Sequence, residues 1–278
     1  MTRPVIAFIG GGNMARSLIG GLLAGGSDPT DIRVADPNAE QRHTLEQHYD
    51  GITTAADSGD VVGEATVWVL AVKPQVLAEV ATGLAAAANR HRPLIISIAA
   101  GVRSTDLERW LGGNNPALVR AMPNTPALVG SGATGLYATG AVTPDQRHQA
   151  ETVLGAVGVT VWVDDEAQLD TVTALSGSGP AYFFRVMEAL EQAAVSAGLA
   201  ADKARLLTLQ TAFGAAKMAL NSDEDPSTLR TRVTSPGGTT ERGLAALDQG
   251  GIERLFDSAL QAARQRSEEL GDILGEQQ

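Results

Sequence analysis

Residues 5–15 read VIAFIGGGNMA, a short run of β-branched and aromatic residues that passes through three glycines into helically spaced apolar residues. This order predicts a strand, a tight turn and a helix. In a turn that binds a dinucleotide, Gly10 suits the bend, Gly12 lets the backbone approach a pyrophosphate, and Ala15 fills the small position where helix packs on strand. Glycine loops that bind nothing are also common, so the interpretation depends on the later strands and helices of the chain.

Apolar runs alternate with helical patterns through the first half of the chain. After residues 5–9, the expected strands are residues 32–35, 66–72, 94–98 and 118–122, with a further strand at 160–163 before an acidic run at 164–166. Uninterrupted apolar runs are typical of parallel strands covered on both faces. We therefore predict an α/β fold, with an N-terminal Rossmann-like dinucleotide-binding domain over residues 1–165 and an all-α C-terminal domain over residues 166–278.

Asp36 ends the second expected strand, 24 residues after Gly12. Dinucleotide sites place at this point the residue that contacts the adenosine ribose, where a carboxylate accepts from a 2′-hydroxyl and repels a 2′-phosphate. The alternative is a simple turn residue before Pro37. Both interpretations remain open.

Other strand ends are expected to line the same crevice, because ligands bind beyond the carboxyl ends of strands in open α/β sheets. Lys73 is the cation among them, and Pro74 at a helix start fixes it near the crevice. A solvated lysine is the ordinary alternative. Residues 99–101 form a second strand end, and Asn124 lies between two prolines in a third.

Composition narrows the possible functions. The formal net charge is −11 and the chain contains no cysteine. The acidic balance argues against nucleic acid as a partner, and the lack of cysteine excludes disulfides and thiol catalysis. No stretch approaches the ~20 apolar residues of a membrane span, so we expect a cytoplasmic protein without a membrane partner. We expect no metal site, and we expect surface positions for the histidines, which share no ligand spacing: His43, His48, His91 and His148.

The second half has helical patterns throughout. Gly179 is expected as the N-cap and Pro180 as the first residue of a helix. Small residues are frequent on these helices, which predicts close packing beyond one chain and hence a homo-oligomer. Stripes of large apolar residues with helical spacing are expected to form core, and they include Phe183, Val186, Leu190, Leu206, Leu209, Phe213, Leu255 and Phe256.

A polar bend stands in the middle of this helical half. Residues 233–243 read VTSPGGTTERG, a rigid Pro-Gly-Gly bend followed by two threonines and a helical pattern. The first N–H groups of a helix have no intrahelical partner and carry partial positive charge, so this bend can hold a small carboxylate substrate. Thr239 and Thr240 add hydroxyl donors. The alternative is that one of them only caps the helix.

Five motifs resemble those of pyrroline-5-carboxylate reductase: FIGGGNM at residues 8–14, AVKPQ at 71–75, RAMPNTP at 120–126, LSGSGPAY at 175–182 and VTSPGGTT at 233–240. The resemblance spans nearly the whole chain, and its last two motifs are specific to that family. It implies reduction of the cyclic imine 1-pyrroline-5-carboxylate to L-proline by NADPH or NADH, the last step of proline biosynthesis. It also implies dimers through the C-terminal helices, which assemble into rings of dimers such as a decamer.

The resemblance and the strand ends together give two sets of site residues. Thr240 is the expected catalytic residue, which hydrogen-bonds the ring nitrogen of the substrate while Ser235 and the N–H groups of Gly238 and Thr239 hold its carboxylate. The substrate-binding set is Thr173, Ser235, Gly238, Thr239 and Thr240. The cofactor-binding set is Ile9, Gly10, Gly11, Gly12, Asn13, Met14, Asp36, Val72, Lys73, Pro74, Ala99, Ala100, Gly101 and Asn124.

Two positions depart from the family pattern. Asp36 stands where many members have a small polar residue suited to a 2′-phosphate, so the choice between NADPH and NADH stays open. Asp223 stands where some members have a glutamate near the substrate.

Two other functions are weighed against this one. A related hydroxy-acid dehydrogenase would use a lysine on a helix, here Lys217, and we expect its helix to lack the partner asparagine one turn on that such enzymes show. A non-catalytic dinucleotide-binding regulator would keep the glycine loop but lose the bend at residues 233–243, which this chain retains.

Overall fold

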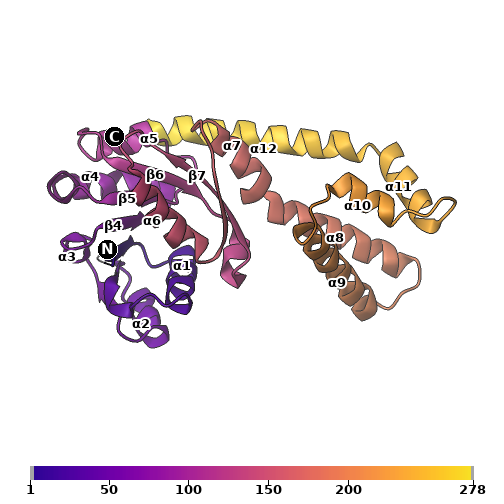
Figure 1. Cartoon of the computed structure of the whole chain (residues 1–278), viewed down its shortest axis with the longest axis horizontal. Coiled ribbons are helices and arrows are strands. Elements are labelled where there is room, and N and C mark those ends of the chain that lie inside the picture. The colour runs from indigo at the N-terminus through magenta and orange to yellow at the C-terminus, as the bar shows by residue number, and fades with distance from the viewer. Residues whose placement is uncertain (1–2, 277–278) are drawn as a thin grey trace. The chain divides into compact units, whose positions relative to one another are not determined.

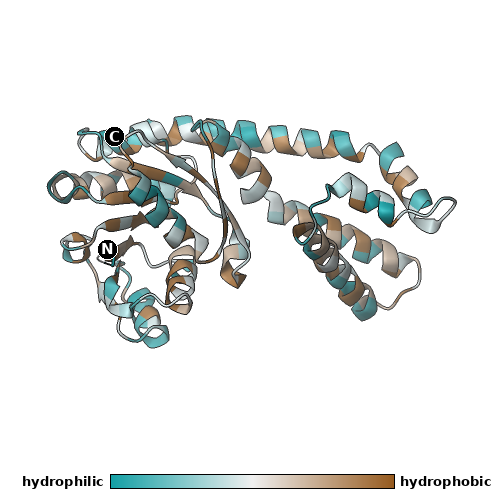
Figure 2. Ribbon diagram, viewed as in Figure 1, coloured by the Kyte–Doolittle hydropathy of each residue, from teal (hydrophilic) through white to brown (hydrophobic). Residues whose placement is uncertain are grey.

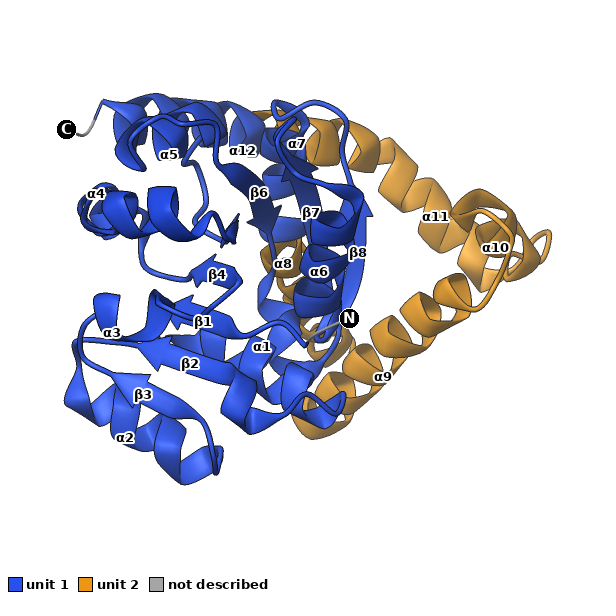
Figure 3. Ribbon diagram, turned by 60° about the vertical axis from the view of Figure 1, so that its left-hand side comes forward, with its two compact units in different colours: residues 1–178, 262–278 blue, residues 179–261 orange. Residues whose placement is uncertain are grey.

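The chain forms two compact units in a computed structural model that describes residues 3–276. We call them the sheet unit, made of residues 1–178 and 262–278, and the helical unit, residues 179–261 (Figures 1 and 3). The long last helix, α12 (Ile252–Gly275), contributes its first part to the helical unit and its last part to the sheet unit.

One eight-stranded sheet forms the centre of the sheet unit. Strands β1 to β6 run parallel, β7 is antiparallel to β6, and β8 is parallel to β7. The order is β3-β2-β1-β4-β5-β6-β7-β8, which changes direction between β1 and β4, where doubly wound sheets bind dinucleotides. The strands are β1 (Ile6–Ile9), β2 (Ile32–Ala35), β3 (Thr53–Ala55), β4 (Val67–Leu70), β5 (Leu94–Ser97), β6 (Ala117–Met122), β7 (Gly132–Ala138) and β8 (Gly158–Trp162).

Helices cover both faces of this sheet and bury a core on each. One core joins α1 and α6 to strand residues such as Phe8 and Ile96. The other joins α3, α4 and α5 to strand residues such as Trp68 and Ile95. Figure 2 shows the apolar residues gathered along the strands. The helices are α1 (Asn13–Ala24), α2 (Ala39–His48), α3 (Gly59–Val62), α4 (Pro74–His91), α5 (Ser104–Trp110), α6 (Pro144–Gly155) and α7 (Gln168–Val172), with short turns η1 (Pro29–Asp31), η2 (Thr125–Val129) and η3 (Thr173–Gly177).

The predicted strands are confirmed, within a few residues at their ends, as β1, β2, β4, β5, β6 and β8, but the sequence pattern predicts neither β3 nor β7. Gly132 and Gly135 interrupt the apolar alternation of β7. A side chain at Gly135 would lie 2.6 Å from Val172, so glycine is needed there for α7 to pack on the sheet. A strand that must contain glycine for packing loses the pattern that identifies strands.

The two compact units divide after Ser178, whereas the predicted functional boundary between residues 165 and 166 stays a prediction. α7 packs on β7 and belongs to the sheet unit, which continues to Ser178. The end of α12 also belongs to it, because Leu274 is buried in the second core and a side chain on Gly271 would lie 3.2 Å from the carbonyl oxygen of Gly101. Arg103 and Asp272 form an ion pair of 2.6 Å at the same contact.

The helical unit contains α8 (Gly179–Ser196), α9 (Ala201–Leu220), α10 (Pro226–Arg232), α11 (Thr239–Gln249) and the first part of α12. The prediction that its apolar stripes form core of this chain is wrong. Phe183 is 68% exposed and Leu206 is 67% exposed, and the other large apolar residues of these stripes are also exposed. Helical spacing gives an apolar face but does not say whether the same chain or another chain covers it.

Two further expectations concern surface residues and membranes. The four histidines are exposed, as predicted. Within residues 3–276, no helix is both long enough and apolar enough to cross a bilayer.

Candidate functional site

The turn between β1 and α1 has the backbone that the sequence predicts for a phosphate site. Gly10 has a φ of +104°, and a side chain on it would lie 2.7 Å from the carbonyl oxygen of Ala71. Gly12 is the N-cap of α1, and no atom lies within 4 Å of the place where its side chain would be. Among the described residues no side chain caps α1, so its first N–H groups remain for a ligand. This open helix start fits the pyrophosphate of a dinucleotide.

Asp36 lies beside the same turn, at the end of β2. Its carboxylate accepts from the N–H of Gly11 at 2.8 Å and, through the other oxygen, from the N–H of Asn38 at 2.9 Å. Asp36 is therefore a turn residue and also an acid next to the glycine loop, where the adenosine ribose of a dinucleotide lies. Arg42, which the motifs do not single out for binding, donates to the carbonyl oxygen of Asp36 at 2.7 Å.

The strand ends at β4 and β5 lie next to this turn in the sheet order. Lys73 is the exposed N-cap of α4, and Pro74 is its first residue, as predicted. In the turn after β5, Ala99 and Gly101 are buried whereas Ala100 is exposed. Of these three residues, Ala100 alone is therefore open to a cofactor at this strand end.

Asn124 has structural partners at both ends of its amide. Its Nδ2 donates to the carbonyl oxygen of Ser176 at 3.0 Å, and its Oδ1 accepts from the N–H of Ala133 at 2.9 Å. The side chain is buried. This geometry supports a clamp between the turn after β6, the start of β7 and η3, rather than the predicted contact with a cofactor.

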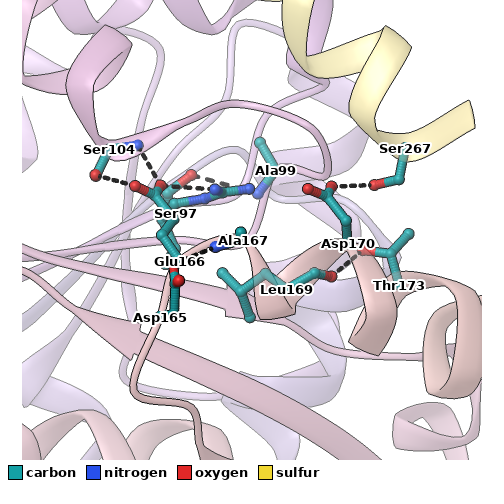
Figure 4. Close-up of polar contacts among 11 residues, drawn as sticks. Ser97, Ala99, Ser104, Asp165, Glu166, Ala167, Leu169, Asp170, Thr173 and Ser267 are labelled. Atoms are coloured by element: carbon teal, nitrogen blue, oxygen red, sulfur yellow. Dashed lines mark hydrogen bonds and ion pairs between the residues drawn. The ribbon is translucent and has the colours of Figure 1, made fainter. Parts of the chain in front are cut away.

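Thr173 begins η3, a π-helical turn that connects α7 to α8. The backbone of Val172 and Ser178, on either side of this turn, has helical angles, and α8 begins at Gly179, so Gly179 is not the predicted N-cap and Pro180 is the second residue of the helix. The hydroxyl of Thr173 donates to the carbonyl oxygen of Leu169 at 2.8 Å (Figure 4). The lone pairs of its oxygen remain available as acceptors.

A buried ion pair that the sequence analysis missed lies at the turn after β5. Arg120 of β6, 9% exposed, donates to Glu166 at 2.6 Å. Ser104 donates to the same carboxylate through its N–H and its hydroxyl, each at 2.6 Å (Figure 4). Burial acts to raise the pKa of Glu166, but the hydrogen bonds from Ser104 and the charge of Arg120 outweigh burial and hold that pKa below its usual value. An arginine inside an apolar strand was the available signal, because a buried cation needs a partner.

In the helical unit, α11 begins at Thr239 with Gly238 as its N-cap. No side chain caps this helix among the described residues, so the alternative that Thr239 or Thr240 serves only as a cap is not supported. Gly237 has a φ of +72°, which explains a glycine at that point of the bend. Glu241 reaches back and accepts from the N–H of Gly237 at 2.9 Å.

The predicted role of Gly238 as a donor to the substrate needs correction. Its N–H donates to the carbonyl oxygen of Ser235 at 3.0 Å, within the bend itself. A side chain on Gly238 would lie 2.9 Å from that oxygen, so the tight bend requires glycine. Within residues 3–276, the donors that remain at this helix start are the N–H groups of Thr239, Thr240 and Glu241 and the hydroxyls of the two threonines.

The expectation about Lys217 is also wrong in one respect. Asn221 does stand four residues after Lys217, at the end of α9, but its amide donates to the carbonyl oxygen of Lys217 at 2.8 Å. The ammonium group of Lys217 lies over the ring of Phe213, 5.8 Å from its centre. The amide of Asn221 and the ammonium group of Lys217 thus each have a partner within the same helical segment.

Comparisons with known proteins cover both units. A family model described as pyrroline-5-carboxylate reductase dimerisation matches residues 166–270, and one described as NADP oxidoreductase, coenzyme F420-dependent, matches residues 5–101. A pyrroline-5-carboxylate reductase of Pseudomonas aeruginosa is 51% identical over 276 residues, which are 99% of this chain and 100% of that protein.

Solved structures agree with these matches. A pyrroline-5-carboxylate reductase from Coxiella burnetii is 45% identical, with a TM-score of 0.94 over 97% of this chain and 99% of that one. Pyrroline carboxylate reductase of Plasmodium falciparum, solved with NADP bound, is 26% identical, with a TM-score of 0.83 over 98% of this chain and 99% of that one. A 3-hydroxyisobutyrate dehydrogenase of Mycobacterium tuberculosis, at 18% identity and a TM-score of 0.50, shares the fold alone.

These findings decide between the three functions. The match to a dimerisation domain shows that the protein is a homo-oligomer. The regulator and the hydroxy-acid dehydrogenase are set aside by identity that extends over the whole chain. The chain belongs to the pyrroline-5-carboxylate reductase family, the NAD(P)H-dependent oxidoreductases that act on a C=N bond in proline biosynthesis.

Proposed function

We propose that the start of α11 binds the imino acid 1-pyrroline-5-carboxylate and that Thr240 orients its ring nitrogen. The observation that carries this proposal is the uncapped helix start, where Thr239 and Thr240 have N–H groups and hydroxyls without partners in the bend. A helix start of this kind attracts a carboxylate. We assign the substrate carboxylate to the hydroxyl of Ser235 and the N–H of Thr239.

Glu241 sets a limit on this site. Its carboxylate lies in the first turn of α11 and already binds the N–H of Gly237. A second carboxylate nearby is repelled by it, so the substrate must bind on the side of Thr239 and Thr240. The resemblance adds Thr173 as a further substrate contact.

The reduction of the imine requires few protein groups. The bound nicotinamide supplies the hydride. The residues of this chain bind the substrate and orient its imine carbon for transfer. Because a threonine hydroxyl is a weak acid, we assign orientation to Thr240, and the proton on the ring nitrogen comes from water or is already present on the iminium.

Two substitutions of Thr240 test the proposal. Thr240→Ala should remain folded, bind NADPH normally and lose about 10²- to 10³-fold in kcat, the usual cost of one well-placed donor. Thr240→Ser keeps the hydroxyl and should stay near wild type. If Thr240→Ala loses only about 1 kcal/mol of stability while kcat and kcat/KM stay unchanged, Thr240 is a helix-start residue and nothing more.

For the cofactor we propose the crevice at the ends of β1, β2, β4 and β5. The open space at Gly12 and the φ of Gly10 support contact with the pyrophosphate. Asp36 supports use of NADH at least as well as NADPH, since a 2′-phosphate carries about −1.5 to −2 charges. The remaining cofactor residues are assigned on the resemblance: Ile9, Gly11, Asn13, Met14, Val72, Lys73, Pro74, Ala99, Ala100 and Gly101.

We further propose a separate function for each of two parts of the chain. Residues 1–165 bind the dinucleotide, and residues 166–278 bind substrate and form the oligomer. The assembly is a ring of dimers such as a decamer, in the cytoplasm, where a protein without cysteine needs no oxidising environment.

A further inference from the structure

The carbonyl of Ser176 has no backbone donor four residues further on, because residue 180 is a proline. The π turn η3 follows α7, and α8 begins at Gly179 after a bend at Ser178, with Pro180 as its second residue. Proline has no N–H, so it cannot donate to the carbonyl four residues earlier, which belongs to Ser176. The chain widens at this point into a π turn, in which the N–H of Ser178 donates to the carbonyl of Thr173 at 2.8 Å.

Asn124 supplies the missing donor from another part of the chain. Its Nδ2 donates to the carbonyl of Ser176 at 3.0 Å. Its Oδ1 accepts from the N–H of Ala133 at 2.9 Å, which fixes the orientation of the amide. Since Asn124 follows β6 and is 9% exposed, this contact holds the π turn against the carboxyl end of the sheet, the edge at which the cofactor crevice lies.

The packing around the turn leaves little freedom. A side chain on Gly177 would lie 2.6 Å from the methyl group of Met122, and one on Gly135 would lie 2.6 Å from Val172. The turn therefore lies on the end of β6, and the end of α7 that leads into it lies on the middle of β7. Thr173 starts this turn, so its place at the sheet edge depends on the same contacts.

We propose that Asn124 is a positioning residue for imine reduction: it replaces the donor that Pro180 lacks and so fixes the π turn that carries Thr173. This role differs from the contact with the cofactor that the sequence suggests. The proposal rests on the proposed contact of Thr173 with the substrate, and its test separates the two.

The first measurement compares the effect of Asn124→Ala on turnover of the substrate with its effect on binding of the cofactor. Asn124→Ala should lower kcat/KM for 1-pyrroline-5-carboxylate by about 10- to 100-fold, since a small misplacement in a reacting site has effects of this size. The Kd of NADPH, measured by titration calorimetry, should stay within about twofold, because the clamp touches no cofactor in this assignment. Asn124→Asp keeps the acceptor for Ala133 but loses the donor to Ser176, and should match Asn124→Ala in kcat/KM.

The second measurement is a rescue. Pro180→Ala places an N–H four residues after Ser176, the spacing of an α-helical hydrogen bond to its carbonyl, and we expect the variant to be near wild type by itself. In that background, Asn124→Ala should lower kcat/KM by less than about threefold, so the two substitutions are strongly coupled in a double-mutant cycle. A purely structural role would change the unfolding midpoint without this coupling in kcat/KM.

Several results would overturn the proposal. A rise of tenfold or more in the Kd of NADPH for Asn124→Ala, with no rescue by Pro180→Ala, would make Asn124 a cofactor contact. Unchanged kcat and KM with a lower unfolding midpoint would make it structural only. If Thr173→Ala has wild-type kcat/KM, the substrate role of Thr173 fails, and coupling between positions 124 and 180 then still decides whether Asn124 positions the turn for the reaction.

Discussion

Gly12→Ala should weaken dinucleotide binding without unfolding the protein. Gly12 has φ −69° and ψ −174°, angles that alanine adopts readily, and no atom lies within 4 Å of the added methyl group. We expect the free energy of unfolding to change by less than about 1 kcal/mol, since the loss of a good N-cap and the lower entropy of the unfolded chain oppose each other.

The effect on binding depends on the contact that the methyl group displaces. If the pyrophosphate lies against Gly12, the methyl group blocks a hydrogen bond between a phosphate oxygen and the helix start. Such charge-assisted bonds contribute about 1.5–3 kcal/mol each, which corresponds to a Kd about 10- to 150-fold higher for NADPH and for NADH.

Gly10→Ala is the matched control for Gly12→Ala. Its φ of +104° strains any side chain, and the added Cβ would lie 2.7 Å from the carbonyl oxygen of Ala71. Left-handed backbone adds about 1–2 kcal/mol and overpacking about 1–3 kcal/mol, so we expect a loss of about 2–5 kcal/mol of stability. Calorimetric titration and urea unfolding of both variants give the two quantities. A Gly12→Ala variant with the wild-type Kd would refute the assignment of the pyrophosphate to this turn.

The remaining predictions concern cofactor choice, acid stability and assembly. The wild type should show kcat/KM for NADH at least equal to that for NADPH, and Asp36→Ser should shift the ratio toward NADPH by about tenfold, because one charge repulsion of ~1.4 kcal/mol is removed. The ionised Glu166 carboxylate stabilises the fold at pH values above the ordinary carboxyl pKa of about 4.3, because its own pKa is lowered in the folded protein, and this stabilisation is lost as the pH falls further. Glu166→Gln should therefore lower the free energy of unfolding at pH 7 by about 1–3 kcal/mol and make that free energy less dependent on pH in the acid range. Phe183→Glu should shift the mass measured by light scattering toward the 28.8 kDa of one chain, whereas Val76→Glu on α4, 45% exposed, should leave the oligomer intact.

Each of these predictions has a result that contradicts it. A clear NADPH preference of the wild type would mean that Arg42 offsets the charge of Asp36. An unfolding curve of Glu166→Gln that keeps the wild-type slope below pH 4 would remove Glu166 from the acid response. An unchanged oligomer mass for Phe183→Glu would exclude the exposed face of α8 from the interface.

Local patterns in the sequence were sufficient for the dinucleotide fold. Parallel strands buried on both faces require long apolar runs, and a tight β–α turn requires glycine, so residues 5–15 and the next four runs predict β1, β2, β4, β5 and β6 without tertiary information. The bend before α11 was predictable for the same reason, because Gly237 has a backbone conformation that other residues rarely adopt.

Sequence patterns did not predict whether the apolar faces of the helices are covered by the same chain or by another one. The spacing of Phe183 and Leu206 gives a helix with an apolar side, but an apolar side can face its own chain or another one. Only the packed structure shows that these side chains are exposed in one chain. The antiparallel β7 was missed because Gly135 serves helix packing and breaks the strand pattern.

The tertiary structure alone decided which polar groups are free and which are used. The sequence suggests Asn124 for the cofactor and the N–H of Gly238 for the substrate, yet the first is bound to Ser176 and Ala133 and the second to Ser235. The ion pair between Arg120 and Glu166 joins residues 46 positions apart. Hydrogen bonds act over about 3 Å, so their partners depend on how distant segments meet in space, whereas strand and helix patterns depend on neighbours along the chain.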